Sequence, residues 1–253
     1  ARVGLAAMRA AIPYRLAPAS KFAQVFYNHR LTQRRSRSEK PEHEYNQDLI
    51  RYFLKQQNIP ILKNPGAPFL HFDDQETKEK KRYFCHQNKI KPETPLIFMH
   101  PGSGGSANNL SITQYAKLAR KLNLKEGHHI VLTAGPGELE TAKKLSRDLD
   151  QIPHHIFESK RGLRHFAENI QFSDLFISGS TGPLHIAGAL DVPTAAFYPR
   201  RRSATALRWQ TLNSAENRLS FSPDTIDQRK ESLNIDVNEA AHLISKKFLI
   251  KRN

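Results

Sequence analysis

Residues 95–122 read PLIFMHPGSGGSANNLSITQYAKLARKL, and this stretch decides the fold. Its apolar run at 96–100 has the length of a buried strand, and the apolar positions after Ser111 recur at helical spacing. Ser111 and Gln114 form the S-x-x-Q capping box that marks a helix start, which predicts a helix over residues 112–124. The glycine-rich segment between them is therefore predicted to be a loop that joins the carboxyl end of a strand to a helix.

The alternation of strand and helix continues to about residue 198. Parallel strands joined by crossover helices form a doubly wound α/β sheet, and ligands of such sheets bind beyond the carboxyl ends of the strands. The strand-to-helix loops are therefore the places to look for a site. Further strands are predicted over 129–133, 155–157, 174–178 and 194–198, and the helices between them over 138–149, 163–171 and 183–190.

The rest of the chain is organised differently. A helix end at 1–12, a short strand at 14–16 and an arginine-rich polar stretch precede an amphipathic helix predicted over 44–57. Residues 60–95 combine five prolines with many charges, which is typical of an interdomain linker. A last helix is predicted over 237–248, with Asp236 as its N-cap. The predicted domains are residues 1–92 including the linker, residues 93–230, and a terminal helical segment at 231–253.

The loop GSTGP at residues 179–183 has the chemistry of an anion site. Proline suits the first position of a helix, where free N–H groups lie at the positive end of the helix dipole. Small hydroxyl-bearing residues beside them can donate to a phosphate. An ordinary tight turn is the alternative interpretation, with the nearby histidine half-buried and hydrogen-bonded. The candidate residues are Ser180, Thr181, Gly182, Pro183 and His185.

Two other loops share this character. In HPGSGGSANN, Gly104 and Gly105 permit close approach of the backbone to a ligand, and Ser103 supplies a hydroxyl. The loop lacks the Walker A ending and the G-x-G-x-x-G spacing, and a flexible turn is the alternative. In AGPGE, Glu138 opens a helix. A carboxylate is favoured there by the helix dipole whether or not it accepts a hydrogen bond from a ribose hydroxyl.

The chain is strongly basic, since 39 Lys and Arg exceed 24 Asp and Glu and give a formal net charge of +15. This charge favours anionic partners such as nucleic acid, a phosphorylated glycolipid, a nucleotide or an acidic membrane surface. No zinc-finger, RRM or basic-zipper signature accompanies it, and basic clusters also occur as solvated loops. The single cysteine, Cys85, permits no internal disulfide, and no apolar run reaches the ~18 residues that span a bilayer. These features predict a cytoplasmic protein.

Three segments together resemble a known family. HPGSGGSANNLSITQYAKLARKL, IVLTAGPGELETAKKL and DLFISGSTGPLHIAGALDVPTAAFYP, in this order and spacing, are similar to the ADP-heptose:lipopolysaccharide heptosyltransferases, glycosyltransferase family nine. The resemblance is specific over about residues 94–212 and fainter over 1–58. It implies an α/β fold of GT-B type, with two Rossmann-like doubly wound domains and a last helix that returns toward the first. It also implies that the N-terminal domain is incomplete in this chain, because the acidic catalytic base would precede Ala1.

The resemblance further implies roles for single residues. Residues that would surround the donor diphosphate are Ser180, Thr181, Gly182, Pro183 and His185. Residues that would line the donor cleft are Ser103, Gly104, Gly105 and Asn108, with Glu138 at the ribose or adenine.

Positive charge is the main departure from the family pattern. Asn108 stands where the family usually has a lysine, so we expect at least one of Arg200, Arg201 and Arg202 to contact the donor diphosphate. A second basic cluster, Arg34, Arg35 and Arg37, is expected to bind phosphates of the acceptor.

The resulting hypothesis is a glycosyltransferase that moves heptose or a similar sugar from an ADP-sugar to the lipopolysaccharide inner core, by inverting displacement without a metal or cofactor. Its partners would be the nucleotide-sugar, the phosphorylated lipid A and core acceptor, and the cytoplasmic surface of the inner membrane, with no nucleic acid. One alternative is a non-catalytic GT-B-like protein that binds nucleotide or glycan. The other is a basic nucleic-acid-binding protein, which steeply salt-dependent DNA binding would reveal.

Overall fold

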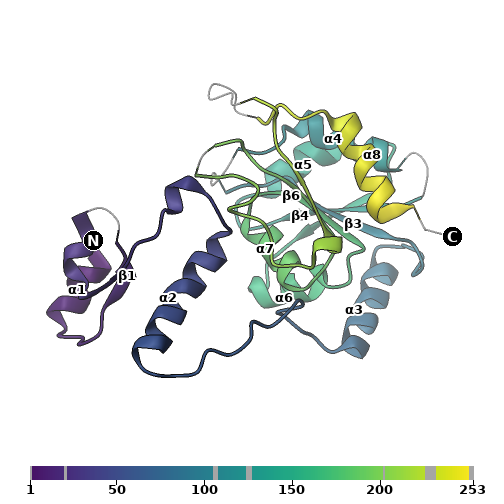
Figure 1. Cartoon of the computed structure of the whole chain (residues 1–253). Coiled ribbons are helices and arrows are strands. Elements are labelled where there is room, and N and C mark those ends of the chain that lie inside the picture. The colour runs from purple at the N-terminus through teal and green to yellow at the C-terminus, as the bar shows by residue number, and fades with distance from the viewer. Residues whose placement is uncertain are drawn as a thin grey trace. The chain divides into compact units, whose positions relative to one another are not determined.

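The computed structural model describes residues 2–19, 22–104, 108–123, 127–201, 203–225 and 232–250. The chain forms two compact units (Figure 1). Unit 1 comprises Ala1–Asn64 and Arg201–Trp209, and unit 2 comprises Pro65–Arg200 and Gln210–Asn253. Within the described residues, no helix combines the length and apolar character needed to cross a membrane.

Unit 2 is built on a six-stranded parallel sheet in the order β5-β4-β3-β6-β7-β8. The chain enters this sheet at the central strand β3 and proceeds outward through β4 to β5. It then returns to β6, on the other side of β3, and proceeds through β7 to β8 at the opposite edge. The direction reverses between β3 and β6, which makes the carboxyl ends of these two strands the topological switch point. The strands are β3 (Leu96–His100), β4 (His129–Ala134), β5 (His154–Glu158), β6 (Leu175–Gly179), β7 (Thr194–Phe197) and β8 (Arg218–Phe221).

Helices cover both faces of this sheet (Figure 1). Ile97 and Met99 of β3 join one core cluster with apolar side chains of α4, α5 and α8. Phe98 points to the other face, where its ring lies 6.2 Å from that of Phe84 and 5.9 Å from that of Phe172. The helices of unit 2 are α3 (Asp74–Gln87), α4 (Ile112–Asn123), α5 (Leu139–Arg147), α6 (Gly162–Ile170), α7 (Gly182–Ala189) and α8 (Val237–Ile244), the last continued by a π-helical turn at Ser245–Leu249.

The predicted helix starts are confirmed by their capping contacts. The Ser111 hydroxyl accepts from the Gln114 N–H at 3.2 Å, and the Gln114 side chain accepts from the Ser111 N–H at 2.9 Å. Asp236 accepts from the N–H groups of Asn238 and Glu239. Local sequence therefore places these helix ends correctly. Other helix starts differ from the prediction by one or two residues; α7, for example, begins at Gly182, and Pro183 occupies its second position.

In unit 2, one helix and one strand were not expected from the sequence. Helix α3 lies within the stretch interpreted as a linker, and its N-cap Asp73 accepts from the Glu76 N–H at 2.9 Å. Its single buried residue is Cys85, and most of its other residues are charged or polar, so the apolar periodicity that would predict a helix is weak. The sixth strand, β8, contains four residues and pairs with β7 at the sheet edge, which gives it too little apolar patterning to detect.

Unit 1 is smaller and contains a two-stranded parallel sheet of β1 (Leu16–Pro18) and β2 (His29–Leu31). The rings of Tyr14 and His29 stack at 3.9 Å beside these strands. The other elements of unit 1 are α1 (Arg2–Arg9), α2 (Glu42–Gln56), and the 3-10 helices η1 (Phe22–Phe26) and η2 (Arg35–Arg37).

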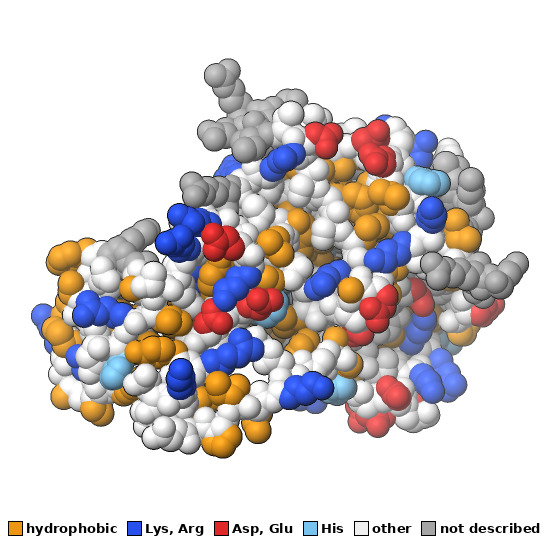
Figure 2. Space-filling view, viewed as in Figure 1, with side chains coloured by type: hydrophobic (Ala, Val, Ile, Leu, Met, Phe, Trp, Pro, Cys, Tyr) orange, Lys and Arg blue, Asp and Glu red, His pale blue; other side chains and the backbone are white. Residues whose placement is uncertain are grey.

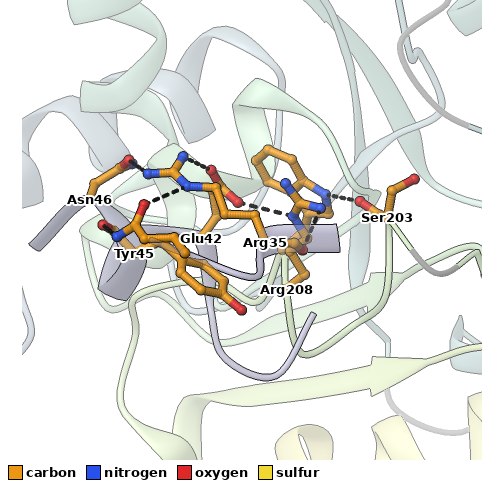
Figure 3. A network of polar contacts seen from close by, with 8 residues as sticks. Arg35, Glu42, Tyr45, Asn46, Ser203 and Arg208 are labelled. Carbon is orange, nitrogen blue, oxygen red and sulfur yellow. Dashed lines mark hydrogen bonds and ion pairs between the residues drawn. The ribbon is translucent and has the colours of Figure 1, made fainter. Parts of the chain in front are cut away.

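The compact units differ from the predicted domains at two places. Residues 65–92 belong to unit 2, because α3 packs there on the sheet through Phe84. Residues 201–209, which the sequence placed in the second domain, belong to unit 1. A partly buried acid holds them: the Glu42 carboxylate lies 2.6 Å from the Arg35 guanidinium and 3.0 Å from that of Arg208 (Figure 3).

Candidate functional site

A cavity of about 260 Å³ opens in unit 2 at the switch point of the sheet. The loops that follow β3, β4, β5 and β6 all contribute to it, as the strand order requires. Its lining residues are His100, Ser103, Gly104, Gly135, Pro136, Glu138, Ser159, Leu163, Phe166, Thr181, Gly182 and Pro183.

Glu138 connects two of these loops. Its Oε1 accepts a hydrogen bond from the Gly104 N–H at 2.9 Å, and its Oε2 accepts one from the Gly135 N–H at 3.0 Å. Its side chain is 16% exposed, so it lies in the cavity wall and still reaches the open space. The carboxylate therefore fixes the glycine loop after β3 against the turn after β4.

Glycine is required beside this carboxylate. A Cβ atom on Gly102 would lie 2.3 Å from the Glu138 carboxyl carbon, well inside van der Waals contact. Gly104 has a φ of +52°, a conformation that side-chain-bearing residues rarely adopt. The glycines thus let the β3 loop close on Glu138, which is a more specific role than the general freedom predicted from the sequence.

His100, the last residue of β3, was not among the residues predicted for the site. Its ring is 1% exposed and lies between two groups: Nδ1 is 3.0 Å from the Thr133 hydroxyl and Nε2 is 3.3 Å from Glu138 Oε2. Burial lowers the pKa of His100, which keeps the ring neutral near pH 7, although the Glu138 charge opposes this shift. Its position directly before PGSGG was the available signal.

The start of α7 forms the opposite wall. The first N–H groups of a helix have no acceptor within the helix, and they lie at the positive end of its dipole. Thr181 is the N-cap, but its side chain makes no capping bond; its hydroxyl lies 3.0 Å from that of Ser178 instead. A ligand acceptor can therefore use the N–H groups of this helix start.

A buried asparagine holds the two walls together. Asn109 accepts from the Tyr115 hydroxyl at 2.8 Å and donates to the Pro101 carbonyl at 3.2 Å. A Cβ atom on Gly179 would lie 2.5 Å from its amide oxygen. Asn109 thus packs the β3 loop against the end of β6, a structural role that the sequence analysis did not assign.

The structure places some of the predicted donor-site residues around this cavity and leaves others outside its lining. Asn108 and Ser180 are partly exposed neighbours of the lining loops, and burial lowers the pKa of the nearby His185. Gly105 lies outside the described residues. Those in the lining are Ser103, Gly104, Glu138, Thr181, Gly182 and Pro183.

Arg200 and Arg201 differ in their surroundings. Arg200 donates to the backbone carbonyls of Pro223, at 3.4 Å, and Asp224, so it braces the segment after β8. Arg201 is exposed and belongs to unit 1, whereas Arg200 belongs to unit 2. Arg202 lies outside the described residues.

The other predicted cluster is similarly divided. Arg35 binds Glu42 and donates to Asn46 at 3.0 Å, so its charge is neutralised inside unit 1 (Figure 3). Arg34 is exposed, and Arg37 is 49% exposed with its guanidinium 3.6 Å from Glu39. Arg34 and Arg37 are therefore the members that can reach a ligand.

Charge is unevenly distributed between the units. Residues 1–64 and 201–209 contain 15 Lys and Arg against 4 Asp and Glu, a net charge of +11. The other 180 residues contain 24 against 20, a net charge of +4. Figure 2 shows basic side chains of the N-terminal part interspersed with hydrophobic ones. Unit 1 thus carries most of the excess charge in under a third of the chain.

The fold and this site define a Rossmann-like domain with a cavity at its switch point. Residues 11–233 match the sequence model of glycosyltransferase family 9 (heptosyltransferase), and the chain belongs to this family.

Named relatives are consistent with this membership. A Haemophilus influenzae protein whose name assigns it provisionally to the glycosyltransferases is 42% identical over 99% of this chain and 71% of its own length. Lipooligosaccharide heptosyltransferase 2 of Campylobacter jejuni is 26% identical over 72% of this chain, which spans 56% of that protein. The chain is therefore related to the lipopolysaccharide heptosyltransferases.

Solved structures show the fold. The family 9 glycosyl transferase of Veillonella parvula superposes with a TM-score of 0.71 at 17% identity, over 97% of this chain and 69% of that one. The ADP-heptose lps heptosyltransferase II of E. coli gives 0.69 at 19% identity, over 98% and 73%. The predicted α/β fold of GT-B type is confirmed.

Proposed function

We propose that this protein transfers heptose or a similar sugar from an ADP-sugar donor to the inner core of lipopolysaccharide. The observation that carries this proposal is the cavity in which Glu138, the glycine loop and the start of α7 meet. Such a cavity offers separate groups for the two polar parts of a nucleoside diphosphate.

The diphosphate would lie at the start of α7, where the N–H groups and the dipole favour negative charge. A ribose hydroxyl would donate to Glu138, since a carboxylate oxygen can accept more than one hydrogen bond. Pro136 and Leu163 supply apolar surface beside it for the base, and Leu163 is 74% exposed.

The proposed chemistry is inverting displacement without a metal. Negative charge grows on the departing diphosphate, and preorganised N–H donors at the start of α7 would stabilise it. Asn108 can add only a neutral donor. Arg201 or Arg202 remain proposed sources of positive charge, whereas Arg200 already binds two carbonyls. A general base is proposed from outside the residues 1–253.

The acceptor would meet unit 1, whose net charge suits the phosphates of lipid A and core. Arg34 and Arg37 are the proposed contacts. The same charge would attract the anionic surface of the inner membrane from the cytoplasmic side, where we propose that the protein acts as a peripheral enzyme.

One other function is supported by a specific observation. Glu138 is the one carboxylate among the described residues that line the cavity, and it already holds two backbone N–H groups. A protein that binds the nucleotide without turnover would use the same cavity. Release of ADP in the presence of donor and acceptor distinguishes the enzyme from this alternative.

Titration calorimetry with ADP tests the donor site, using the full chain. We expect binding, and a higher melting temperature by mass action. Glu138→Gln should weaken binding roughly ten-fold, since hydrogen bonds to a charged group are the stronger ones. Glu140→Gln is the matched control, because Glu140 lies two residues later, is 69% exposed and pairs with Lys143. A folded protein that binds no ADP at millimolar concentration would contradict the proposal.

A further inference from the structure

We propose that His100 is a positioning residue for the donor site, which holds the Glu138 carboxylate where a ribose hydroxyl can bind it. This inference rests on the proposed nucleotide site and names a residue to which that function assigns no role. Its basis is the juxtaposition of a buried imidazole, a buried hydroxyl and the carboxylate in one line across β3, β4 and the start of α5.

The two contacts of the ring favour one position for the imidazole proton. Glu138 can only accept, so the nitrogen that faces it, Nε2, carries the hydrogen. Nδ1 then accepts from the Thr133 hydroxyl, 3.0 Å away. Thr133 is fully buried, and its hydroxyl can donate or accept, so it accommodates the tautomer that the contact with Glu138 selects.

The carboxylate is held by all of its neighbours in one orientation. Oε2 receives the imidazole N–H and the Gly135 N–H, and Oε1 receives the Gly104 N–H. The carboxylate also lies directly against Gly102, where an added Cβ atom would be 2.3 Å from its carboxyl carbon. With Oε2 bonded to protein groups, Oε1 is the oxygen that accepts a ribose hydroxyl in addition to Gly104.

Removal of the imidazole donor would let the carboxylate rotate. A Glu138 carboxylate that samples two rotamers binds a ribose hydroxyl less well, because binding must restore the one orientation that accepts it. His100 therefore affects how strongly the site prefers a nucleotide with ribose hydroxyls to one that lacks them. It leaves contacts to the diphosphate unchanged.

Two side chains of similar polarity separate the donor role from simple packing. The amide nitrogen of glutamine reaches the position of Nε2, whereas that of asparagine reaches only the position of Nδ1. His100→Gln therefore retains a donor to Glu138, and His100→Asn removes it. The readout is the ratio of affinities for ADP and 2′,3′-dideoxy-ADP, measured by calorimetry, with the melting temperature of each variant as a fold control.

We expect the wild-type protein to prefer ADP roughly ten-fold, as one hydrogen bond to a charged group allows. His100→Asn should reduce the ratio to about one, and His100→Gln should restore most of it. If His100→Asn does not fold, Thr133→Val against Thr133→Ser makes the same comparison through the partner of Nδ1.

The remaining outcomes separate the two proposals. A wild-type protein that binds no ADP overturns the proposed function. Three results with ADP still bound would show that the positioning role is wrong while the nucleotide site stands. The affinity ratio could be one in the wild-type protein, it could be unchanged in His100→Asn, or it could fall equally in both His100 variants.

Discussion

The two units of this protein differ in burial and in charge. In unit 2, four central strands are buried throughout, and one carboxylate is fixed by backbone N–H groups at a cavity. In unit 1, large apolar side chains are exposed, with Val3 at 77%, Phe22 at 79% and Leu62 at 84%, and the net charge is +11. Donor binding in unit 2 should therefore depend on geometry, and acceptor binding through unit 1 on charge. The following experiments test this contrast.

The largest difference is expected in packing. Phe98 is fully buried between α3 and the sheet, so Phe98→Ala should lower the free energy of unfolding by about 3–5 kcal/mol. Phe22→Ala, at a 79% exposed position of unit 1, should change it by no more than ~0.5 kcal/mol. Urea denaturation measures both. Similar losses would show that the units do not differ in packing as described.

Geometry at the donor cavity can be tested without disturbing the fold. A Cβ atom on Gly182 has no heavy atom within 4 Å, so Gly182→Val should fold normally and extend into the space proposed for the diphosphate. We expect ADP affinity to fall roughly a hundred-fold, about 2.7 kcal/mol, by calorimetry. Gly66→Val, at an equally open position away from the cavity lining, is the control. Equal losses from both variants would refute the assignment.

Charge in unit 1 is tested by removing two exposed arginines. The double variant Arg34→Ala, Arg37→Ala should raise the KM for the lipid acceptor about ten-fold at low ionic strength, with a smaller effect as salt screens the charges. Donor affinity should not change. Lys143→Ala with Lys144→Ala removes the same charge from unit 2 and should leave the acceptor KM as it is. A fall in donor affinity would instead assign the arginines to the other substrate.

The smallest effect concerns pH and unit 2. Burial, with the neighbouring His155 and His154, lowers the pKa of His129 to about 4, and its Nε2 lies 2.6 Å from His155 Nδ1. An unfolded histidine titrates near 6.5, so the unfolded state binds the proton first as pH falls. Stability present above pH 6.5 should therefore be lost between pH 6.5 and 4, by on the order of 1 kcal/mol.

His129→Gln should flatten this part of the profile of unfolding free energy against pH. An unchanged slope in the variant would mean that other groups produce the acid sensitivity.

The sequence predicted the elements of unit 2 well where apolar periodicity was strong. Strand β3 has the predicted bounds, and the capping box at Ser111 is present as expected. Helix α3 was missed because its surface is highly charged and its apolar contacts are few. For the site, small residues and a helix start drew attention to Thr181 and Gly182, which do line the cavity. No local pattern favoured Asn109 over Asn108 as the residue that joins the two walls of the cavity.

What the sequence determined by itself is local: strand and helix periods, helix caps, loops able to bind anions, and the excess of positive charge. Only the tertiary structure decided which loops meet. His100 and Glu138 are brought together by the strand order, and Glu42 binds Arg208, 166 residues away. Periodicity and capping act over a few residues, so they can be detected in the sequence. A contact between distant side chains depends on the path of the whole sheet, and no local pattern records it.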